Sequence, residues 1–125
     1  MTGNKLVLTT TGSREEAQRI AHALVERRLA ACVNIVPGIE SIYRWQEKIE
    51  QAHEWLLLIK TTGEAFEHVR DAIEALHSYD VPECICLEIE DGSAAYLKWL
   101  SESVVPSRSS PLEGGLCGRV PKAGS

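Results

Sequence analysis

Four side chains that can bind a metal ion or form hydrogen bonds lie close together near the middle of the chain. They are His77, Tyr79, Asp80 and Glu83. A helical pattern ends here and Pro82 favours a turn, so these residues lie where a helix passes into a strand. Polar residues and proline are common at such a corner whatever the protein does, so a purely structural turn fits the same pattern. If the chain has a functional site, we expect it at this corner.

His77 is the strongest single candidate for a metal ligand. The last turn of a helix leaves carbonyl groups unpaired and carries the negative end of the helix dipole, and both favour a cation. A histidine at this position also often bonds only to backbone carbonyls. Glu83 and Asp80 could supply oxygen ligands beside it, although both are ordinary turn residues. The predicted metal site consists of His77, Glu83 and Asp80.

Cys84 and Cys86 follow directly and share one face of a predicted strand. Side chains two residues apart on a strand point the same way at a spacing of about 6.7 Å, which disfavours a disulfide but permits a shared soft metal ion. Alternatively, these small thiols simply pack against a helix or a neighbouring subunit, which the residue type favours. Cys32 follows two alanines and is predicted to be a core residue.

A thiol enzyme with Cys84 as nucleophile and His77 as base is a third interpretation. Nucleophilic catalysis also needs a group that orients the base, and the sequence contains no known motif of this kind. It also lacks a phosphate-binding glycine loop, and no pair of carboxylates stands out from turns and helix surfaces. We therefore predict that the protein is not an enzyme and requires no cofactor, with copper or another divalent cation as an optional ligand.

Composition limits the remaining classes of function. The 125 residues suffice for one domain, and 44% hydrophobic and 25% charged residues are typical of a globular protein. No apolar run is long enough to cross a bilayer, and neither an export nor a lipidation signal is present, so we predict a cytoplasmic protein without a membrane partner. A net charge of −5 without a basic cluster argues against nucleic acid. The four cysteines are predicted to be thiols.

The elements that position the corner follow from hydrophobic periodicity and from turn residues. Strands are expected at 5–11, 29–45, 48–61 and 83–90, and helices at 13–28, 61–77 and from 93 onward. Pro37 and Gly38 predict a bulge within the second strand. Ser13 with Glu16 and Thr61 with Glu64 have the spacing of capping boxes at the starts of the first two helices, and Ser93 is expected to cap the third.

This order of elements predicts an α+β fold, the split βαβ arrangement of ferredoxin-like domains with an added C-terminal helix. Both main helices would cover one face of a four-stranded antiparallel sheet. Residues 55–59 are apolar without alternation, which indicates that both faces of that strand are buried. The simplest cover for the second face is another copy of the chain, so we predict an obligate homo-oligomer.

The domain is predicted to span residues 1–105. Residues 106–125 are rich in proline, serine and glycine and are predicted to form a flexible tail, in which Cys117 would be an exposed thiol.

Several motifs in this order resemble the CutA family of divalent-cation tolerance proteins over roughly residues 5–104. They are Leu29–Ile35, Ser41–Trp45 with Lys48–Glu50, Ile59–Thr61, Tyr79–Glu83 with Asp91-Gly92, and Tyr96–Leu100. The resemblance implies a cytoplasmic homotrimer of ferredoxin-like subunits whose sheets pack around the three-fold axis. The family's proposed copper-binding histidine matches His77. Three positions depart from the family pattern: Thr9 replaces a cysteine of some relatives, Ser78 a common proline, and Glu47 a common glycine.

Two functions follow as hypotheses. The first is a trimeric cytoplasmic protein of divalent metal-ion response that binds copper or a similar ion near the end of the second helix. The alternative is a regulatory module, like the PII signalling proteins in architecture, whose intersubunit cleft holds a small anionic metabolite opposite Lys60. Residues expected to line or pack that cleft are Tyr43, Trp45, Lys60 and Tyr79.

Overall fold

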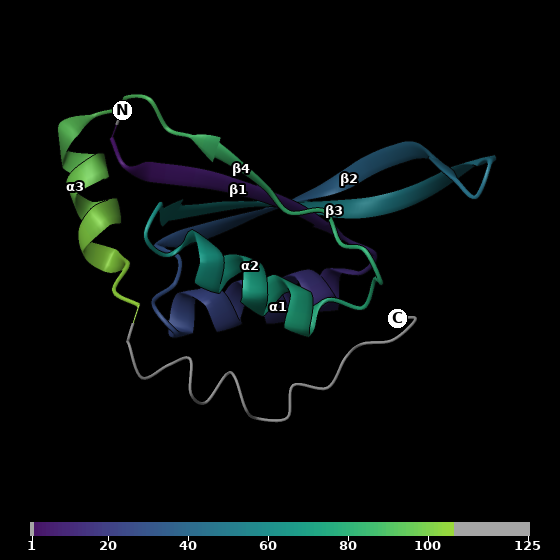
Figure 1. The fold of residues 1–125 in the computed structure, drawn as a ribbon, viewed down its shortest axis with the longest axis horizontal. Helices are drawn as coiled ribbons and strands as arrows, with labels where there is room; N and C mark the ends of the chain where they lie inside the picture. Colours follow the sequence, from purple (N-terminus) through teal and green to yellow (C-terminus); the bar gives the residue numbers. More distant parts are fainter. Residues whose placement is uncertain (1, 107–125) are drawn as a thin grey trace.

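The computed structural model describes residues 2–106 and contains one antiparallel sheet and three helices (Figure 1). In chain order the elements are β1 (Asn4–Thr11), α1 (Arg14–Glu26), β2 (Cys32–Trp45), β3 (Lys48–Thr62), α2 (Phe66–Leu76), β4 (Ile85–Glu88) and α3 (Ala94–Ser103). The four strands lie in the order β2-β3-β1-β4. The predicted α+β fold, with its split βαβ order and added C-terminal helix, is confirmed. The predicted tail lies outside the described residues apart from Pro106.

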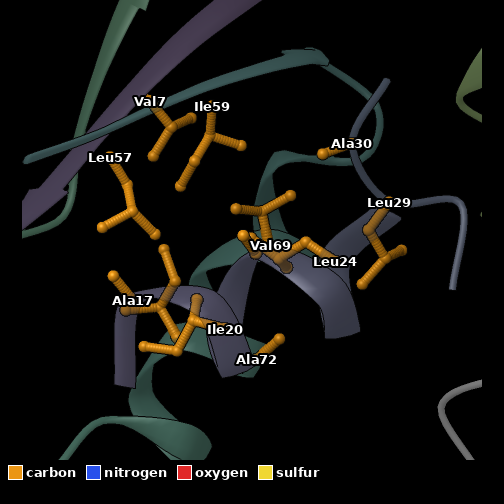
Figure 2. Packing of buried hydrophobic residues seen from close by; sticks show 12 residues of the cluster. Val7, Ala17, Ile20, Leu24, Leu29, Ala30, Leu57, Ile59, Val69 and Ala72 are labelled. Carbon is orange, nitrogen blue, oxygen red and sulfur yellow. The ribbon is translucent and has the colours of Figure 1, made fainter. Parts of the chain in front are cut away.

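The core lies between the sheet and the helices α1 and α2, which cover the same face (Figure 1). Figure 2 shows side chains of β1 and β3 meeting those of both helices. The fully buried members include Val7, Leu57, Ile59, Ile20, Leu24, Val69 and Ile73. Full burial of one such side chain stabilises the fold by about 1.5–3 kcal/mol. Alternation along β1 and β3 therefore fixes which face of the sheet meets the helices.

Helix α1 begins as predicted, but only half of the expected capping box forms. The Ser13 hydroxyl accepts the backbone N–H of Glu16 at 3.1 Å. The Glu16 carboxylate bonds instead to Ser78, 62 residues away. The helix ends at Glu26, two residues before the predicted end, where Arg28 takes a left-handed backbone with φ of +60°. That conformation ends the helix.

The predicted cap of α2 at Thr61 is wrong. The Thr61 side chain is fully buried and its hydroxyl donates to the Leu29 carbonyl at 2.6 Å. The neighbouring Thr62 hydroxyl accepts the Ala65 N–H at 3.2 Å, and the helix starts at Phe66. Strand β3 runs one residue further than expected, which carries Thr61 into the sheet and leaves its neighbour to bond the turn.

Strands β2 and β3 form a long ribbon that extends beyond the rest of the sheet (Figure 1). The bulge predicted at Pro37-Gly38 is confirmed, because the pairing register shifts between Val36 and Ile39. Gln46 and Glu47 reverse the chain with φ of +51° and +66°, so the tight reversal is confirmed as well. Positive φ at both central residues is the signature of a hairpin turn whose twist matches that of the strands.

The last two elements are shorter or less capped than predicted. Strand β4 covers only Ile85–Glu88 of the expected 83–90, and Ser93 stands at the start of α3 without a side-chain hydrogen bond. Helix α3 lies beside the N-terminal end of β1 (Figure 1). Leu100 and Val104 bury against Ala65 and fix the helix there.

The face of the sheet opposite α1 and α2 carries an apolar surface without cover in the single chain. We call it the open face; its apolar members are Leu6, Leu8, Val36, Leu56, Leu58, Ile85 and Leu87. Ile85 and Leu87 are 46% and 44% exposed. Leu57 and Ile59 are buried while Leu56 and Leu58 are only partly buried. Within one chain, β3 is therefore covered only on its helix side. The predicted cover of its other face is not provided by the single chain.

Candidate functional site

His77 is the fully buried residue that caps the C-terminal end of helix α2, and both of its ring nitrogens are hydrogen-bonded. Nε2 lies 2.6 Å from the Thr10 carbonyl, and Nδ1 accepts the backbone N–H of Tyr79 at 3.1 Å. Because a carbonyl can only accept, the proton of the neutral ring lies on Nε2. In this arrangement the ring joins the end of β1 to the loop after α2, and neither nitrogen is free to bind a metal ion.

Glu16, on the first turn of α1, forms the second anchor of the corner. Its carboxylate accepts the Ser78 backbone N–H at 2.6 Å and the Ser78 hydroxyl at 2.9 Å. One of its oxygens lies 3.3 Å from Nδ1 of His77. Hydrogen bonds to an ionised acceptor are stronger than neutral ones, so this buried carboxylate holds the loop against α1.

Tyr79 and Glu54 form the third anchor. The Tyr79 hydroxyl donates to the Glu54 carboxylate at 2.7 Å, and the Ser41 hydroxyl donates to its other oxygen at 2.6 Å. The Tyr79 ring also packs on the His77 ring, with centroids 4.7 Å apart. Burial first, and then the hydrogen bond to Glu54, raise the pKa of the Tyr79 phenol. The corner is thereby tied to the β2–β3 ribbon.

Of the two acidic residues predicted as metal ligands, Asp80 is exposed and Glu83 is partly buried. Burial and the nearby charge of Glu54 raise the pKa of the Glu83 carboxyl. Within residues 2–106 no three His, Cys, Asp or Glu side chains are grouped so that they could hold a metal ion. The predicted trio of His77, Glu83 and Asp80 therefore does not form a ligand cluster within one chain.

The residues predicted to line a cleft are not brought together in one chain. Tyr43 and Trp45 lie exposed at the tip of the ribbon, and Tyr79 packs in the corner. Lys60 pairs with Cys32 near the opposite end of β3, ten residues from the partner of Tyr43, and donates to Asn34. At about 3.3 Å per residue the tip and Lys60 are roughly 33 Å apart. An anion site built from all four would need more than one copy of the chain.

Cys86 lies on the helix side of β4 and Cys84 directly precedes that strand; both are partly buried against the core, as their residue type favours. Burial raises the pKa of both thiols, so they are not activated nucleophiles. Cys32 is also only partly buried and lies on the open face, so its assignment to the core is wrong. Its pairing with Lys60, which faces away from the helices, places it there.

The sequence did not reveal Glu16, Ser41 and Glu54 as parts of the corner. Glu16 reads as a capping residue and Glu54 as one charge in a strand, and each is far from residues 77–83 along the chain. One signal in the sequence could have identified Glu54: it directly precedes the apolar run 55–59, which suggests that this charged residue is also buried. The carboxylates of Glu16 and Glu54 thus hold the loop of the corner through hydrogen bonds. The charge of Glu54 also acts on the carboxyl of Glu83.

The comparisons with known proteins agree on one family. A family model described as "CutA1 divalent ion tolerance protein" matches residues 5–103. The "Divalent-cation tolerance protein CutA" of Thermus thermophilus is 54% identical over 99 residues, which cover 79% of this chain and 96% of the relative.

Solved structures give the same result. The divalent cation tolerance protein of Thermus thermophilus matches with a TM-score of 0.80 and 52% identity, covering 82% of this chain and 99% of that one. A protein of Archaeoglobus fulgidus, described as a periplasmic divalent cation tolerance protein, matches with a TM-score of 0.79 and 44% identity over 82% of this chain and 99% of its own.

Among the described residues, no helix has the length and apolarity that crossing a membrane requires.

Proposed function

Because the chain belongs to the CutA1 divalent ion tolerance protein family, we propose that it acts in the cellular response to divalent cations as a non-enzymatic homotrimer. We place its cation site at the corner after α2, where copper or a similar ion binds. The cytoplasmic location expected from the sequence stays a prediction, since one relative is described as periplasmic.

The observation that carries the cation site is the position of Glu83 beside Glu54. Burial first, and then the charge of Glu54, raise the pKa of the Glu83 carboxyl and so disfavour its ionisation. A bound divalent cation relieves that repulsion and gains carboxylate ligands. The exposed Asp80, three residues earlier, supplies a further oxygen close to the loop surface.

Within residues 2–106 the carboxylates near this loop do not form a group of three ligands, and this argues for completion of the site by a second copy. The open face and the exposed ribbon tip provide surfaces on which copies can meet. Ile42 and Ile49 of the ribbon are 67% and 63% exposed. Monomeric proteins rarely expose apolar patches of this kind, so these surfaces support an oligomer. In such an oligomer a second copy would supply the ligands that the single chain lacks.

His77 has one of two roles in this proposal. As a positioning residue it holds the loop through Thr10 and Tyr79, as observed. As a ligand, which the sequence predicted, it would have to exchange one of these hydrogen bonds for the metal ion. His77→Gln separates the roles, because a glutamine amide can still donate to the Thr10 carbonyl but is a poor metal ligand.

Calorimetric titration with Cu²⁺ and Zn²⁺ tests the proposal. Glu83→Gln is expected to weaken binding at least tenfold, whereas the control Glu90→Gln, on an exposed residue beyond β4, leaves it unchanged. Binding that persists in His77→Gln assigns His77 a positioning role, and loss there assigns it as a ligand. Equal affinity in wild type and Glu83→Gln would remove the site from this corner.

A further inference from the structure

The outer part of the β2–β3 ribbon, residues 39–54, stands free of the rest of the sheet; we call it the outer ribbon. The pairing of β1 with β3 ends at Thr11 and Trp55, so within one chain the outer ribbon pairs only with itself. Residues 42–51 are all exposed, and Figure 1 shows this end of the ribbon projecting beyond the helices. A two-stranded hairpin alone is at best marginally stable in water. Its position relative to the sheet therefore depends on contacts at its base.

A single carboxylate provides such a contact. Glu54, with 8% of its surface exposed, is the only buried residue of the outer ribbon. It accepts hydrogen bonds from the hydroxyls of Ser41, across the ribbon, and of Tyr79, in the corner. Among residues 2–106, the bond from Tyr79 is the only side-chain hydrogen bond that joins the outer ribbon to another part of the chain. A buried carboxylate without hydrogen bonds is costly, so burial of Glu54 favours the state in which both bonds are made.

The backbone directly opposite Glu54 contains an irregularity at which the outer ribbon can change direction. The register shifts between Val36 and Ile39, and Ile39 is the residue that pairs with Glu54. Gly38, inside the shift, has a φ of +77°. A β-bulge bends the strand that carries it and increases the local twist. The bend and the bonds of Glu54 therefore lie at the same level of the ribbon.

On the corner side, the Tyr79 hydroxyl is itself held in place. The Tyr79 ring packs on the fully buried His77 ring, and the Tyr79 backbone N–H donates to Nδ1 of His77 at 3.1 Å. Gly12, directly after β1, leaves room for the hydroxyl, because a Cβ there would lie 2.9 Å from its oxygen. The end of α2 and the end of β1 thus determine where Glu54 finds its donor.

We infer that Glu54 is a positioning residue through which the corner loop, residues 77–83, sets the direction of the outer ribbon. While Glu54 holds the Tyr79 hydroxyl, the base of the ribbon is fixed against the end of α2. A movement of the loop that withdraws this hydroxyl leaves the carboxylate to water, and the outer ribbon then pivots at the bulge. The exposed tip, with Tyr43 and Trp45, follows the state of the corner. The inference needs no bound ion and does not depend on the proposed cation site.

Hydrogen exchange of the metal-free protein, read by mass spectrometry, tests this link. Tyr79→Phe removes only the hydroxyl that reaches Glu54. We expect the backbone amides of residues 39–53 to exchange roughly tenfold faster, because a bond to a charged acceptor is lost, while those of residues 56–60 are unchanged. Tyr96→Phe, on an exposed tyrosine of α3, is the matched control and should change neither segment. Unchanged exchange at 39–53, or an equal increase in both segments, would overturn the inference.

Two substitutions of Glu54 separate hydrogen bonding from packing. Glu54→Gln can keep both bonds, because its amide oxygen accepts from one hydroxyl and its amide N–H donates to the other. Glu54→Leu keeps a side chain of similar size without hydrogen bonds. We expect exchange of residues 39–53 close to wild type in Glu54→Gln and as fast in Glu54→Leu as in Tyr79→Phe. Equal exchange in the two Glu54 variants would show that these hydrogen bonds do not position the ribbon.

Glu16→Ala tests whether the loop acts on the ribbon through Tyr79. The substitution releases the loop at Ser78, on the side of α1, and leaves Glu54 and Ser41 unchanged. Exchange of residues 39–53 is expected to rise in Glu16→Ala and to rise no further when Glu16→Ala is added to Tyr79→Phe. The same added increase in both backgrounds would mean that the loop does not act through this bond, and the inference would fail.

Discussion

At the scale of single residues, the corner after α2 combines strong hydrogen bonds with one electrostatic conflict. Glu16 and Glu54 each accept two hydrogen bonds, which compensate their partial loss of water. Burial and the charge of Glu54 instead disfavour the ionised form of Glu83. A residue held in an unfavourable charge state costs stability unless a ligand compensates it.

Glu83→Gln is therefore expected to stabilise the metal-free protein at pH 7. The folded state raises the Glu83 pKa above its ordinary value of 4.5, so the unfolded chain loses this proton first as the pH rises, and stability falls above that value. The gain should be less than about 1 kcal/mol, since solvent screens a partly exposed carboxylate. It should vanish below about pH 4, where both states are protonated.

Urea unfolding of wild type and Glu83→Gln at pH 7 and at acid pH measures this difference, with Glu90→Gln as the exposed control. A variant that is less stable than wild type at pH 7 would show that Glu83 makes a favourable contact that the conflict with Glu54 does not outweigh.

Gly12 leaves the space that the Tyr79 hydroxyl occupies. A Cβ at this position would lie 2.9 Å from that oxygen, which the hydrogen bond to Glu54 holds in place. Gly12→Ala is expected to cost about 1–2 kcal/mol of unfolding free energy, because the tyrosine must move and Glu54 loses a donor. In a Tyr79→Phe background the same change should cost less. A double-mutant cycle in urea measures the coupling, and additive effects would contradict the contact.

The position of this corner could be predicted from the sequence, but its hydrogen bonds could not. His77 follows from the end of a helical stripe, a local signal. Its burial and its bonds depend on Thr10 and Glu16, which are more than 60 residues away along the chain. A histidine at a helix end reads the same whether it is exposed or buried, so only the tertiary contacts reveal that both nitrogens are used.

At the scale of elements, the reversal between β2 and β3 holds two residues in a strained backbone conformation. Gln46 and Glu47 both have positive φ, which costs a residue other than glycine roughly 1 kcal/mol. In the two strands that flank the turn, the only other residue with positive φ is Gly38, which adopts it freely. The strain of the ribbon is therefore confined to these two positions.

Glu47→Gly is expected to raise the free energy of unfolding by up to about 1 kcal/mol, since glycine adopts this conformation freely. Glu50→Gly, on the extended part of the same ribbon, is the matched control and should lower it. Thermal unfolding of both variants measures the two shifts. Destabilisation by Glu47→Gly would mean that the glutamate side chain contributes more than the backbone strain costs.

The elements that the sequence predicts well are those with local causes. Pro37-Gly38 produced a bulge, Ser13 a cap, and the apolar stripes two helices on one face. The errors lie at ends, where tertiary contacts decide. Thr61 has the spacing of a cap, yet the sheet needs it as a buried donor to Leu29.

At the scale of the whole molecule, the open face is the main feature that a single chain leaves unexplained. Leu8 lies near its centre, between Leu58 on β3 and Ile85 on β4. Helices α1 and α2 cover only the other face (Figure 1). We therefore expect the proposed trimer to bury the open face.

Leu8→Glu is expected to dissociate the oligomer, because a charge would be buried where the copies meet. Val25→Glu places the same charge on an exposed apolar residue of α1, away from the sheet, and should leave the assembly intact. Analytical ultracentrifugation compares the two variants. If Leu8→Glu sediments like wild type, the copies do not meet on this face.

Native mass spectrometry with increasing Cu²⁺ tests the central proposal most directly, because it reads assembly and cation binding in one spectrum. We expect a species of three chains, each chain of 13.8 kDa, that takes up one ion per chain in wild type and none at the same concentration in Glu83→Gln. A stable species of 13.8 kDa, or a trimer whose ion uptake is unchanged in Glu83→Gln, would contradict it.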